Sequence, residues 1–401
     1  MVWGLVPGGT LSVLRDWVPR LTGHGEVTIL SLGPNRASLG VPTVALGSRW
    51  SHPFRFPQML AYVARMAIAA ARQARGGAST VLVPQDALAT GAAAVIAAMA
   101  SGGRVAVMEH GSAEAVETDR FWRERSAGTA AALRNRLLRG ILRTLNRFVL
   151  RRMVVAMVAG DDAAATYRSR GVAEDRLLRY RFGVDLDRFR PATDAERADA
   201  RRRWGVEGDR GVVASVGRLA PEKGVDDLVR AVGALPEDMA PTLLVAGDGP
   251  LRHELERAAD AAAVAATFVG RVEPDDVVSV LHAADCFVYP ARRGANTPYA
   301  VLEAMASGLA VVATTAPPIH RSMLADGRGI AVEPGDRDAL GDGILAFMGD
   351  RPRAEAAGAA ARRYVETHHS PAEADRAVDA LVRRLWPESA DAQPPLPLTR
   401  R

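Results

Sequence analysis

The sequence contains little cysteine, little lysine and no long apolar run. Cys286 is the only cysteine among 401 residues, which excludes an internal disulfide and fits a reducing compartment. The longest apolar runs, such as 92–100, are too short to cross a bilayer. Residues 1–9 have neither the basic region nor the apolar region of a secretory signal. We therefore expect a cytoplasmic protein, either free or held peripherally at the inner face of the membrane.

Lysine is nearly missing, because Lys223 is the only one among 51 basic residues. This bias marks Lys223 as a candidate for a specific role, although a single lysine can also survive by chance.

The charge is uneven along the chain: residues 1–190 hold 26 arginines against 14 acidic residues, a net of +12, and residues 191–401 carry a net of −7. A basic first part suggests an anionic partner for that part. The aromatic and glycine-rich patterns of nucleic-acid-binding modules do not accompany it, so we predict no nucleic acid partner.

Short apolar strands alternate with helical segments, which predicts an α/β fold with parallel sheets. With 48% apolar residues, the chain can bury two cores. We expect Rossmann-like, doubly wound domains at 1–190 and 191–368, a helix at 369–386 that packs back toward the first domain, and a disordered Pro-rich tail at 387–401. Buried strands are expected at 2–7, 27–30, 80–84, 104–108, 154–158, 212–216, 243–246, 267–269, 286–289 and 309–313.

The segment 131–152 is predicted to form a long helix with one apolar face and one basic face. The basic face consists of Arg136, Arg139, Arg143 and Arg147. A basic amphipathic helix can lie on an anionic membrane surface. A helix that packs on its own sheet and exposes its arginines to water has the same pattern, so the sequence leaves both interpretations open.

Residues 291–314, ARRGANTPYAVLEAMASGLAVVAT, form the stretch around which the second domain is organised. The apolar strand 286–289 precedes it, and a Gly/Asn/Pro loop leads into a helix that begins near Pro298 or Tyr299. The loop presents backbone N–H groups at a helix N-terminus, where an anion is favoured. Glu303 lies one turn into the helix, so a phosphate on the loop and a hydroxyl-rich group near Glu303 fit this unit. An ordinary βαβ connection with a surface glutamate is the alternative.

Arg218 and Lys223 lie five residues apart across a Gly/Pro turn that follows the strand 212–216. The guanidinium group of arginine is a planar fork for phosphate oxygens and the ammonium group of lysine is a point charge, so the pair can neutralise a diphosphate without a metal. Stabilising the charge on a leaving diphosphate is electrostatic catalysis. The sequence has no cluster of Asp, His or Cys with metal-ligand spacing, and we expect no metal. A surface turn with solvated charges is the alternative.

Four segments resemble, in order and spacing, the C-terminal domain of family 4 retaining glycosyltransferases (glycosyl transferases group 1): VGRLAPEKGVDDLVRAV, VAGDGPLRHELE, FVGRVEPDDV and TPYAVLEAMASGLAVVAT. The resemblance is strong over 180–335 and weaker over 1–179, where PGGT, the His-Gly after strand 104–108 and FGVDLDRFRP carry it. It implies the GT-B architecture, in which two Rossmann-like domains face each other across a cleft. It also implies a metal-independent hexosyltransferase without a cofactor, which moves a sugar with retention from a nucleotide-diphosphate sugar to a hydroxyl acceptor.

The resemblance also implies roles for individual residues. Arg218 and Lys223 hold the donor diphosphate and act in catalysis, and Glu303 bonds the ribose hydroxyls. His110 is the third catalytic candidate, near the transferred sugar, although a histidine at a strand end is often only structural. The other donor-binding candidates are Gly9, Gly247, Arg271, Val272, Asn296, Thr297, Pro298, Tyr299 and Ala300. Weaker candidates for binding the acceptor hydroxyl are Asp86, Glu109 and Glu114.

One departure from the family's pattern concerns its two glutamates, which are commonly separated by seven residues. Glu303 is the second, and the first would be at the position of Ala295. In the family the first glutamate lies against the donor sugar, so its loss implies a different sugar, a shifted catalytic arrangement or lost activity. Arg292 and Arg293, just before the loop, could add phosphate contacts instead.

Two alternatives follow from this departure and from the shared architecture. One is a nucleotide-sugar-binding protein without transferase activity. The other is a nucleotide-sugar epimerase, which needs an acid/base pair of carboxylates; Glu109 and Glu114 flank His110 but show no clear pairing. For the donor we favour UDP, with GDP or dTDP as alternatives. The expected acceptor is an envelope lipid or polysaccharide, or a small natural product.

Overall fold

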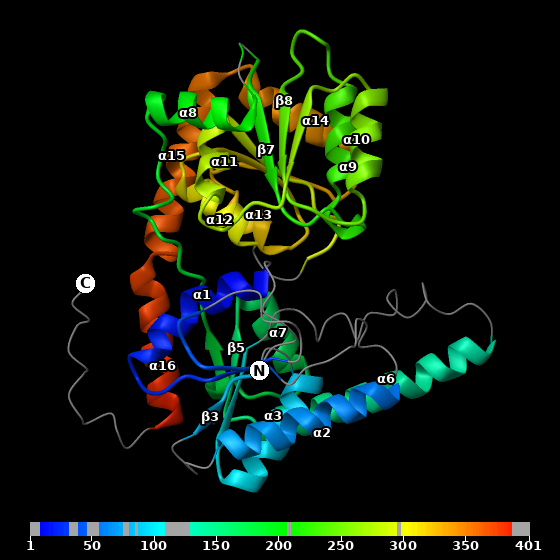
Figure 1. Ribbon diagram of the computed structural model, residues 1–401, viewed down its shortest axis with the longest axis vertical. Coiled ribbons are helices and arrows are strands. Elements are labelled where there is room, and N and C mark those ends of the chain that lie inside the picture. Colours follow the sequence, from blue (N-terminus) through cyan, green and yellow to red (C-terminus); the bar gives the residue numbers. More distant parts are fainter. Residues whose placement is uncertain are drawn as a thin grey trace. The chain divides into compact units, whose positions relative to one another are not determined.

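The computed structural model describes residues 9–31, 39–45, 56–74, 80–84, 87–108, 129–206, 208, 210–294 and 298–386. These residues form two compact units. Unit 1 comprises residues 10–181 and 374–386, and unit 2 comprises Gly9 and Phe182–Glu373. Each unit has its own parallel sheet and its own apolar core (Figure 1), so the two are described separately.

Unit 2 contains a six-stranded sheet in the order β12-β11-β10-β7-β8-β9, and every neighbouring pair is parallel. Most of its strands are short apolar runs that are buried on both faces, which is the usual pattern where helices cover both sides of a parallel sheet. The strands are β7 Val212–Val216, β8 Thr242–Ala246, β9 Ala266–Gly270, β10 Cys286–Tyr289, β11 Ala310–Thr314 and β12 Ile330–Val332.

The chain begins this sheet in its middle. β7, β8 and β9 follow one another to one edge, and the chain then returns to place β10 on the other side of β7. In the register, Cys286 lies opposite Val213 and Phe287 lies opposite Ala214. The strand order therefore reverses between β7 and β10. At such a topological switch point, the loops at the carboxyl ends of the two strands diverge and leave room for a ligand.

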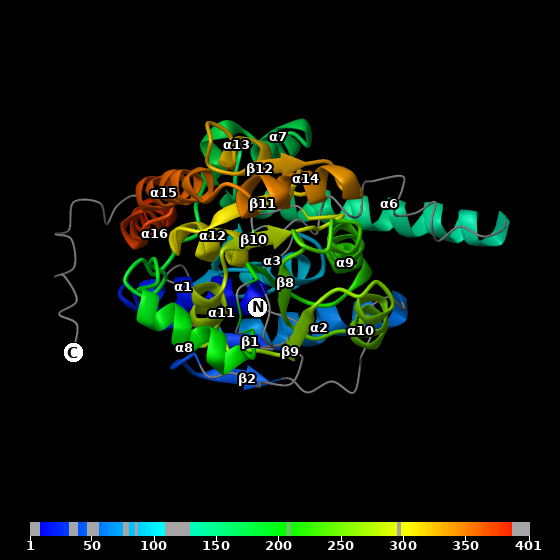
Figure 2. The same ribbon diagram turned by 90° about the horizontal axis from the view of Figure 1, so that it is seen from above.

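Helices cover both faces of this sheet (Figure 2). Helices α9, α10 and α14 pack on one face, and α11, α12 and α15 pack on the other. Phe287, at the centre of the sheet, is completely buried. The helices of unit 2 are α8 Asp194–Trp204, α9 Val225–Gly233, α10 Arg252–Ala261, α11 Val277–Ala283, α12 Tyr299–Ala306, α13 Ile319–Met323, α14 Arg337–Met348 and α15 Arg351–His368, with the 3-10 turn η3 at Pro221–Lys223.

The charged helix α8 is tied to the sheet through Asp285, which directly precedes β10. Arg197 and Arg201 of α8 donate to the two carboxylate oxygens of Asp285 at 2.6 Å each. The backbone N–H of Val212, the first residue of β7, donates to the same carboxylate at 2.8 Å. One carboxylate thus joins α8, β7 and β10.

Unit 1 contains a four-stranded parallel sheet in the order β3-β4-β5-β6 and a separate parallel pair, β1-β2. The strands are β1 Ile29–Ser31, β2 Thr43–Ala45, β3 Val81–Leu82, β4 Arg104–Met108, β5 Val155–Val158 and β6 Leu177–Arg179. The helices are α1 Gly9–Thr22, α2 Phe56–Gln73, α3 Ala89–Ser101, α6 Thr129–Arg152, α7 Asp161–Ser169 and α16 Pro371–Leu385, with the 3-10 turn η2 at Glu174–Arg176.

The last helix, α16, packs within unit 1. Arg384 donates to the carbonyl oxygen of Leu177 at 2.6 Å, and the guanidinium group of Arg104 lies 6.0 Å from the ring centroid of Trp386. These contacts join the C-terminal end of α16 to β4 and β6, although the helix follows unit 2 in the sequence. No helix in the described part of the chain is long and apolar enough to span a bilayer.

The predicted parallel α/β architecture is confirmed in both units. The strands predicted at 104–108, 212–216 and 286–289 match the observed bounds, and the other described strands differ from their predictions by one or two residues at an end. The expected strand at 2–7 and the tail at 387–401 lie outside the described residues. The short strands β2, β6 and β12 were not predicted, because a three-residue strand carries almost no periodic signal. The helices α13 and α14 were also not predicted.

Candidate functional site

The loops that leave the carboxyl ends of β7, β8 and β10 pack against one another through glycines. Gly247 has a φ of +144°, and a Cβ there would lie 1.7 Å from the carbonyl oxygen of Gly217. Gly224 has a φ of +64°, and a Cβ there would lie 2.1 Å from the carbonyl oxygen of Pro290. Neither position has space for a side chain. The glycines therefore bring the three loops together around the switch point.

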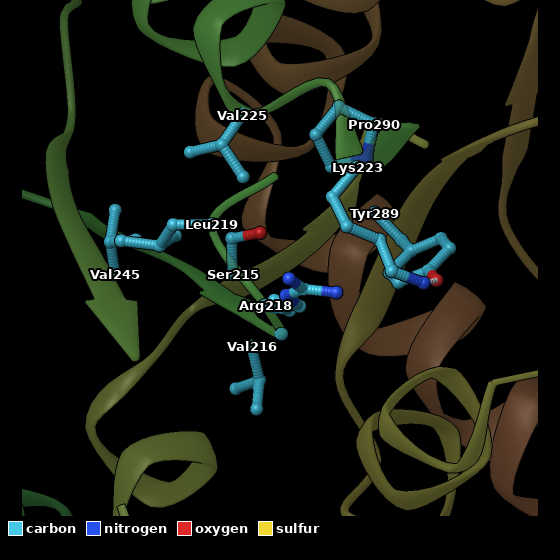
Figure 3. Close-up of a pocket in the computed structure, with 10 residues that line it drawn as sticks. Ser215, Val216, Arg218, Leu219, Lys223, Val225, Val245, Tyr289 and Pro290 are labelled. Carbon is cyan, nitrogen blue, oxygen red and sulfur yellow. Dashed lines mark hydrogen bonds between the residues drawn. The ribbon is translucent and has the colours of Figure 1, made fainter. Parts of the chain in front are cut away.

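Arg218 and Lys223 line the same small hollow at the end of β7 (Figure 3). The Nζ atom of Lys223 donates a hydrogen bond of 2.8 Å to the hydroxyl of Tyr289 and lies 5.4 Å from the centroid of its ring. The side chain of Arg218 is exposed. Within the ranges that the structure describes, neither cation has a carboxylate partner. Two positive charges that nothing neutralises at a switch point favour an anionic ligand.

Tyr289 is the last residue of β10 and is only 5% exposed. Its ring meets the ring of the fully buried His320 edge-on, with centroids 5.8 Å apart. The Nδ1 atom of His320 lies 2.8 Å from the carbonyl oxygen of Thr314. Because a carbonyl can only accept, Nδ1 carries the proton. Burial lowers the pKa of His320 to about 4, so its ring is neutral near pH 7.

Arg292, in the loop after β10, is engaged by the carboxylates of α9. Its Nε and Nη2 atoms lie 2.7 Å and 2.6 Å from Asp227 and Asp226, respectively. Asp227 is 2% exposed and also accepts from Arg337 at 2.8 Å. Burial by itself would raise the pKa of Asp227, but the hydrogen bonds from Arg292 and Arg337 lower it below its usual value. These ion pairs neutralise the charge of Arg292 and fasten its loop to α9. The expected phosphate contact of Arg292 stays a prediction that its neutralised charge disfavours.

Helix α12 begins as expected, with Pro298 at the N-cap position and Tyr299 as the first helical residue. No side chain of the described residues caps this end. The N–H groups of a helix's first turn are oriented toward an anion. Glu303 is partly buried, and its carboxyl group has no hydrogen-bond partner among the residues that the structure places. Burial raises the pKa of Glu303 to about 7, and the positive charge of Arg188 opposes that rise. A carboxyl group without a partner in this setting can accept hydrogen bonds from ligand hydroxyls.

The structure places nine of the predicted site residues in loops or helices that follow the carboxyl ends of neighbouring strands of unit 2: Arg218, Lys223, Gly247, Arg271, Val272, Pro298, Tyr299, Ala300 and Glu303. Arg271 is exposed and Val272 is partly buried, directly after β9. Gly247 N–H donates to the carbonyl oxygen of Gly270 at 2.7 Å, which joins the loops after β8 and β9.

For the remaining predicted residues, a role in the site stays a prediction. Gly9 is the first residue of α1. Seven positions lie outside the described residues: Asp86, Glu109, His110, Glu114, Ala295, Asn296 and Thr297. The interpretation of the sequence also missed Tyr289, His320 and Arg188. Tyr289 carried a weak signal, as a polar tip at the end of an apolar strand, and the other two carried none.

Comparisons with known proteins concern the fold and part of the sequence. Residues 196–364 match the family model Glycosyl transferases group 1. Two solved structures resemble almost the whole chain: HepE of Anabaena, determined with UDP and glucose, at a TM-score of 0.74 and 15% identity, and sucrose-phosphate synthase of Thermosynechococcus elongatus at 0.77 and 20%. The match to HepE covers 95% of this chain and 98% of the HepE chain, and the match to sucrose-phosphate synthase covers 96% of each of the two chains.

The fold is GT-B.

The matched relatives are similar over a shorter range. The chain is 34% identical over 198 residues to the GDP-mannose-dependent monoacylated alpha-(1-6)-phosphatidylinositol monomannoside mannosyltransferase of Corynebacterium glutamicum. This match covers 47% of the chain and 51% of that protein, so the chain spans about half the length of the relative. The sequence similarity to this relative therefore covers about half of the chain, whereas the structural similarity to the two solved structures covers almost all of it.

Proposed function

We propose that the protein is a retaining, metal-independent glycosyltransferase of family 4 that moves a hexose from a nucleotide-diphosphate sugar to a hydroxyl group. The observation that carries this proposal is the pair of cations, Arg218 and Lys223, at the switch point of the sheet in unit 2. Positive charge held in place there would stabilise the negative charge that grows on the leaving diphosphate. The match of residues 196–364 to Glycosyl transferases group 1 supports the same reaction class.

The nucleotide would lie along the carboxyl edge of this sheet. Arg218 and Lys223 bind the diphosphate, and the N-terminus of α12 offers N–H groups to it. Glu303 accepts from the ribose hydroxyls, and the backbone at Arg271 and Val272 borders the base. The interpretation of the sequence favours UDP, the nucleotide bound by HepE. The mannosyltransferase of Corynebacterium glutamicum is named for GDP-mannose, so GDP is the principal alternative.

Calorimetry with UDP, GDP, ADP and dTDP tests the donor site. We expect one nucleotide to bind tightly and Lys223→Ala to weaken that binding by about 10- to 100-fold, the range of a hydrogen bond to a charged group. Arg257→Ala is the matched control, because it removes an exposed positive charge from α10 of the same unit. If no nucleotide binds the wild-type protein, the assignment of Arg218, Lys223 and Glu303 is wrong.

Assays with donor sugars then separate the proposal from its two alternatives. A transferase forms a glycoside in the presence of an acceptor, and NMR of the anomeric proton shows whether configuration is retained. A binding protein gives neither transfer nor donor hydrolysis, which is the result that the alanine at position 295 would explain. An epimerase converts the donor without any acceptor.

For the acceptor, we propose an anionic or membrane-associated molecule that is bound by unit 1. Helices α2, α3 and α6 pack together there and expose large apolar side chains: Ile68 at 55%, Met99 at 58% and Leu137 at 65%. Arg136 and Arg143 are exposed on α6, and Arg136 lines a hollow of about 800 Å³ along that helix. Apolar side chains among arginines suit the surface of an anionic bilayer.

Vesicle sedimentation at low salt tests the membrane contact. We expect the wild-type protein to sediment with vesicles that contain anionic phospholipid and not with purely zwitterionic ones. The double variant Arg136→Glu/Arg143→Glu should remain in solution, whereas the control Arg257→Glu in unit 2 should behave as the wild type. If the wild-type protein ignores anionic vesicles, the membrane contact is wrong and the transferase assignment is unaffected.

A further inference from the structure

We propose that Tyr289 is a positioning residue that aims the ammonium group of Lys223 at the diphosphate of the donor. The inference rests on the proposed function, because it requires a diphosphate ligand at the carboxyl end of β7. In this arrangement Tyr289 acts through Lys223 and does not itself touch the reacting atoms.

The contact between the two side chains restrains an otherwise flexible group. Lysine carries its charge on a four-carbon stem with many rotamers. Here Nζ donates to the hydroxyl of Tyr289 at 2.8 Å, and the ammonium lies 5.4 Å from the ring centroid, within the range of a cation–π contact. An ammonium group has three N–H donors, so two remain for the ligand. A lysine ordered before binding loses less conformational entropy when the ligand arrives.

Lys223 is held by the phenol of Tyr289, whereas the nearby Arg292 is held by carboxylates. Arg292 is held by the carboxylates of Asp226 and Asp227, which fix its position and cancel its charge. A carboxylate at position 289 would likewise order Lys223, but it would compete with a phosphate for the ammonium. The phenol of Tyr289 fixes the ammonium and leaves its whole charge for an anionic ligand.

Tyr289 is itself held firmly enough to serve as an anchor. It is buried at the end of a central strand, and its ring packs edge-on against His320. The hydrogen bond from Nδ1 of His320 to the carbonyl of Thr314 fixes that ring in turn. On the lysine side, the close approach of Gly224 to Pro290 joins the loop that carries Lys223 to the loop that follows Tyr289.

Figure 3 shows the resulting geometry. Lys223 and Tyr289 meet at the wall of the hollow that Arg218 also lines, and the two residues come from the loop after β7 and from the end of β10. These are the two strands between which the order of the sheet reverses. The pair therefore stands where a ligand of this fold is expected.

The test compares the binding of a nucleoside diphosphate with that of the corresponding nucleoside by calorimetry. Tyr289→Phe removes the hydroxyl and keeps the ring. We expect it to weaken binding of the diphosphate by about 10- to 100-fold, as for loss of a hydrogen bond to a charged group, and to leave binding of the nucleoside unchanged. In the Lys223→Ala background the same substitution should have no further effect on the diphosphate. Tyr364→Phe, which removes a hydroxyl from α15 of the same unit, is the matched control.

The outcomes separate this inference from the proposed function. If the wild-type protein binds no nucleotide, both fail. If Lys223→Ala weakens binding and Tyr289→Phe does not, only the positioning role is overturned. It is also overturned if Tyr289→Phe weakens the nucleoside equally, or keeps its effect without Lys223, because either result indicates a merely structural role.

A second measurement does not depend on the folding of a variant. Because the chain has one lysine, selective ¹³C labelling of lysine gives the NMR signals of a single side chain. We expect the Cε signal of the unliganded wild-type protein to relax as an ordered group and to show a ring-current shift. A freely rotating side chain would refute the positioning role.

Discussion

Replacing Glu303 by glutamine should stabilise the unliganded protein at and above neutral pH while weakening its binding of nucleotide. The pKa of Glu303 rises from 4.5 to about 7 because the carboxyl group is buried, although the charge of Arg188 opposes this. A carboxyl group with a higher pKa in the folded state favours folding when it is protonated. The stability is therefore lost progressively as the pH rises from about 4.5 to about 7.

The size of the effect follows from the same pKa difference. Between 4.5 and about 7 the difference is about 2.5, which corresponds to about 3 kcal/mol at about 1.36 kcal/mol per pKa unit. Glu303 is only partly buried, so water screens some of this cost, and a buried amide without partners has a cost of its own. We expect a gain in stability of about 1–2 kcal/mol, or a rise in Tm of roughly 2–8 °C for a unit of this size.

Thermal unfolding of wild type and Glu303→Gln across a pH series measures this directly. The difference in Tm should be largest near pH 8 and should shrink toward about pH 5, where the folded carboxyl group is protonated. Calorimetry at about pH 8 should show weaker nucleotide binding by the variant, because an amide replaces the ionised acceptor of the ribose hydroxyls. A difference in Tm that is independent of pH, or a variant less stable than wild type at about pH 8, would show that the carboxyl group of Glu303 does not destabilise the folded protein when it is ionised.

Two further substitutions test how the site is supported. Gly224→Ala should lower stability by about 2 kcal/mol or more and also weaken nucleotide binding, since a Cβ at a φ of +64° would lie 2.1 Å from the carbonyl oxygen of Pro290. Denaturant titration measures the first effect, and an unchanged midpoint would show that the loop adapts. Asp285→Asn should cost about 1–2 kcal/mol by leaving Arg197 and Arg201 without their shared carboxylate. The loss in Tm should be smaller in high salt, and a loss independent of salt would contradict an electrostatic cause.

Much of unit 2 could be predicted from local patterns. The strands at 212–216 and 286–289 are continuous apolar runs followed by Gly/Pro loops, and the start of α12 coincides with a Pro-Tyr step. These strands and this helix start can be recognised in the sequence because each depends on residues that are neighbours in the chain. The candidate cations at Arg218 and Lys223 could be found in the same way, from their spacing across one turn.

Contacts between residues far apart in the chain could not be predicted from local patterns. The charge of Arg292 looked available from its place before the loop, yet Asp226 and Asp227, more than sixty positions earlier, neutralise it. A local pattern does not show which distant residue will pair with a side chain in the folded protein. Arg292 therefore fastens its loop to α9, and among the described residues at this edge Arg218 and Lys223 keep charges without a carboxylate partner.

The alternation of buried strands and amphipathic helices, the glycine-rich loops at the strand ends and the charges on those loops can be predicted from local patterns of residues. Tertiary structure alone decided the order of the strands, and thus that β7 and β10 are neighbours at a switch point. It also decided that Lys223 rests on Tyr289 and that burial shifts the pKa of Glu303. The physical reason is that pairing, burial and electrostatic surroundings depend on segments that meet only when the chain has folded.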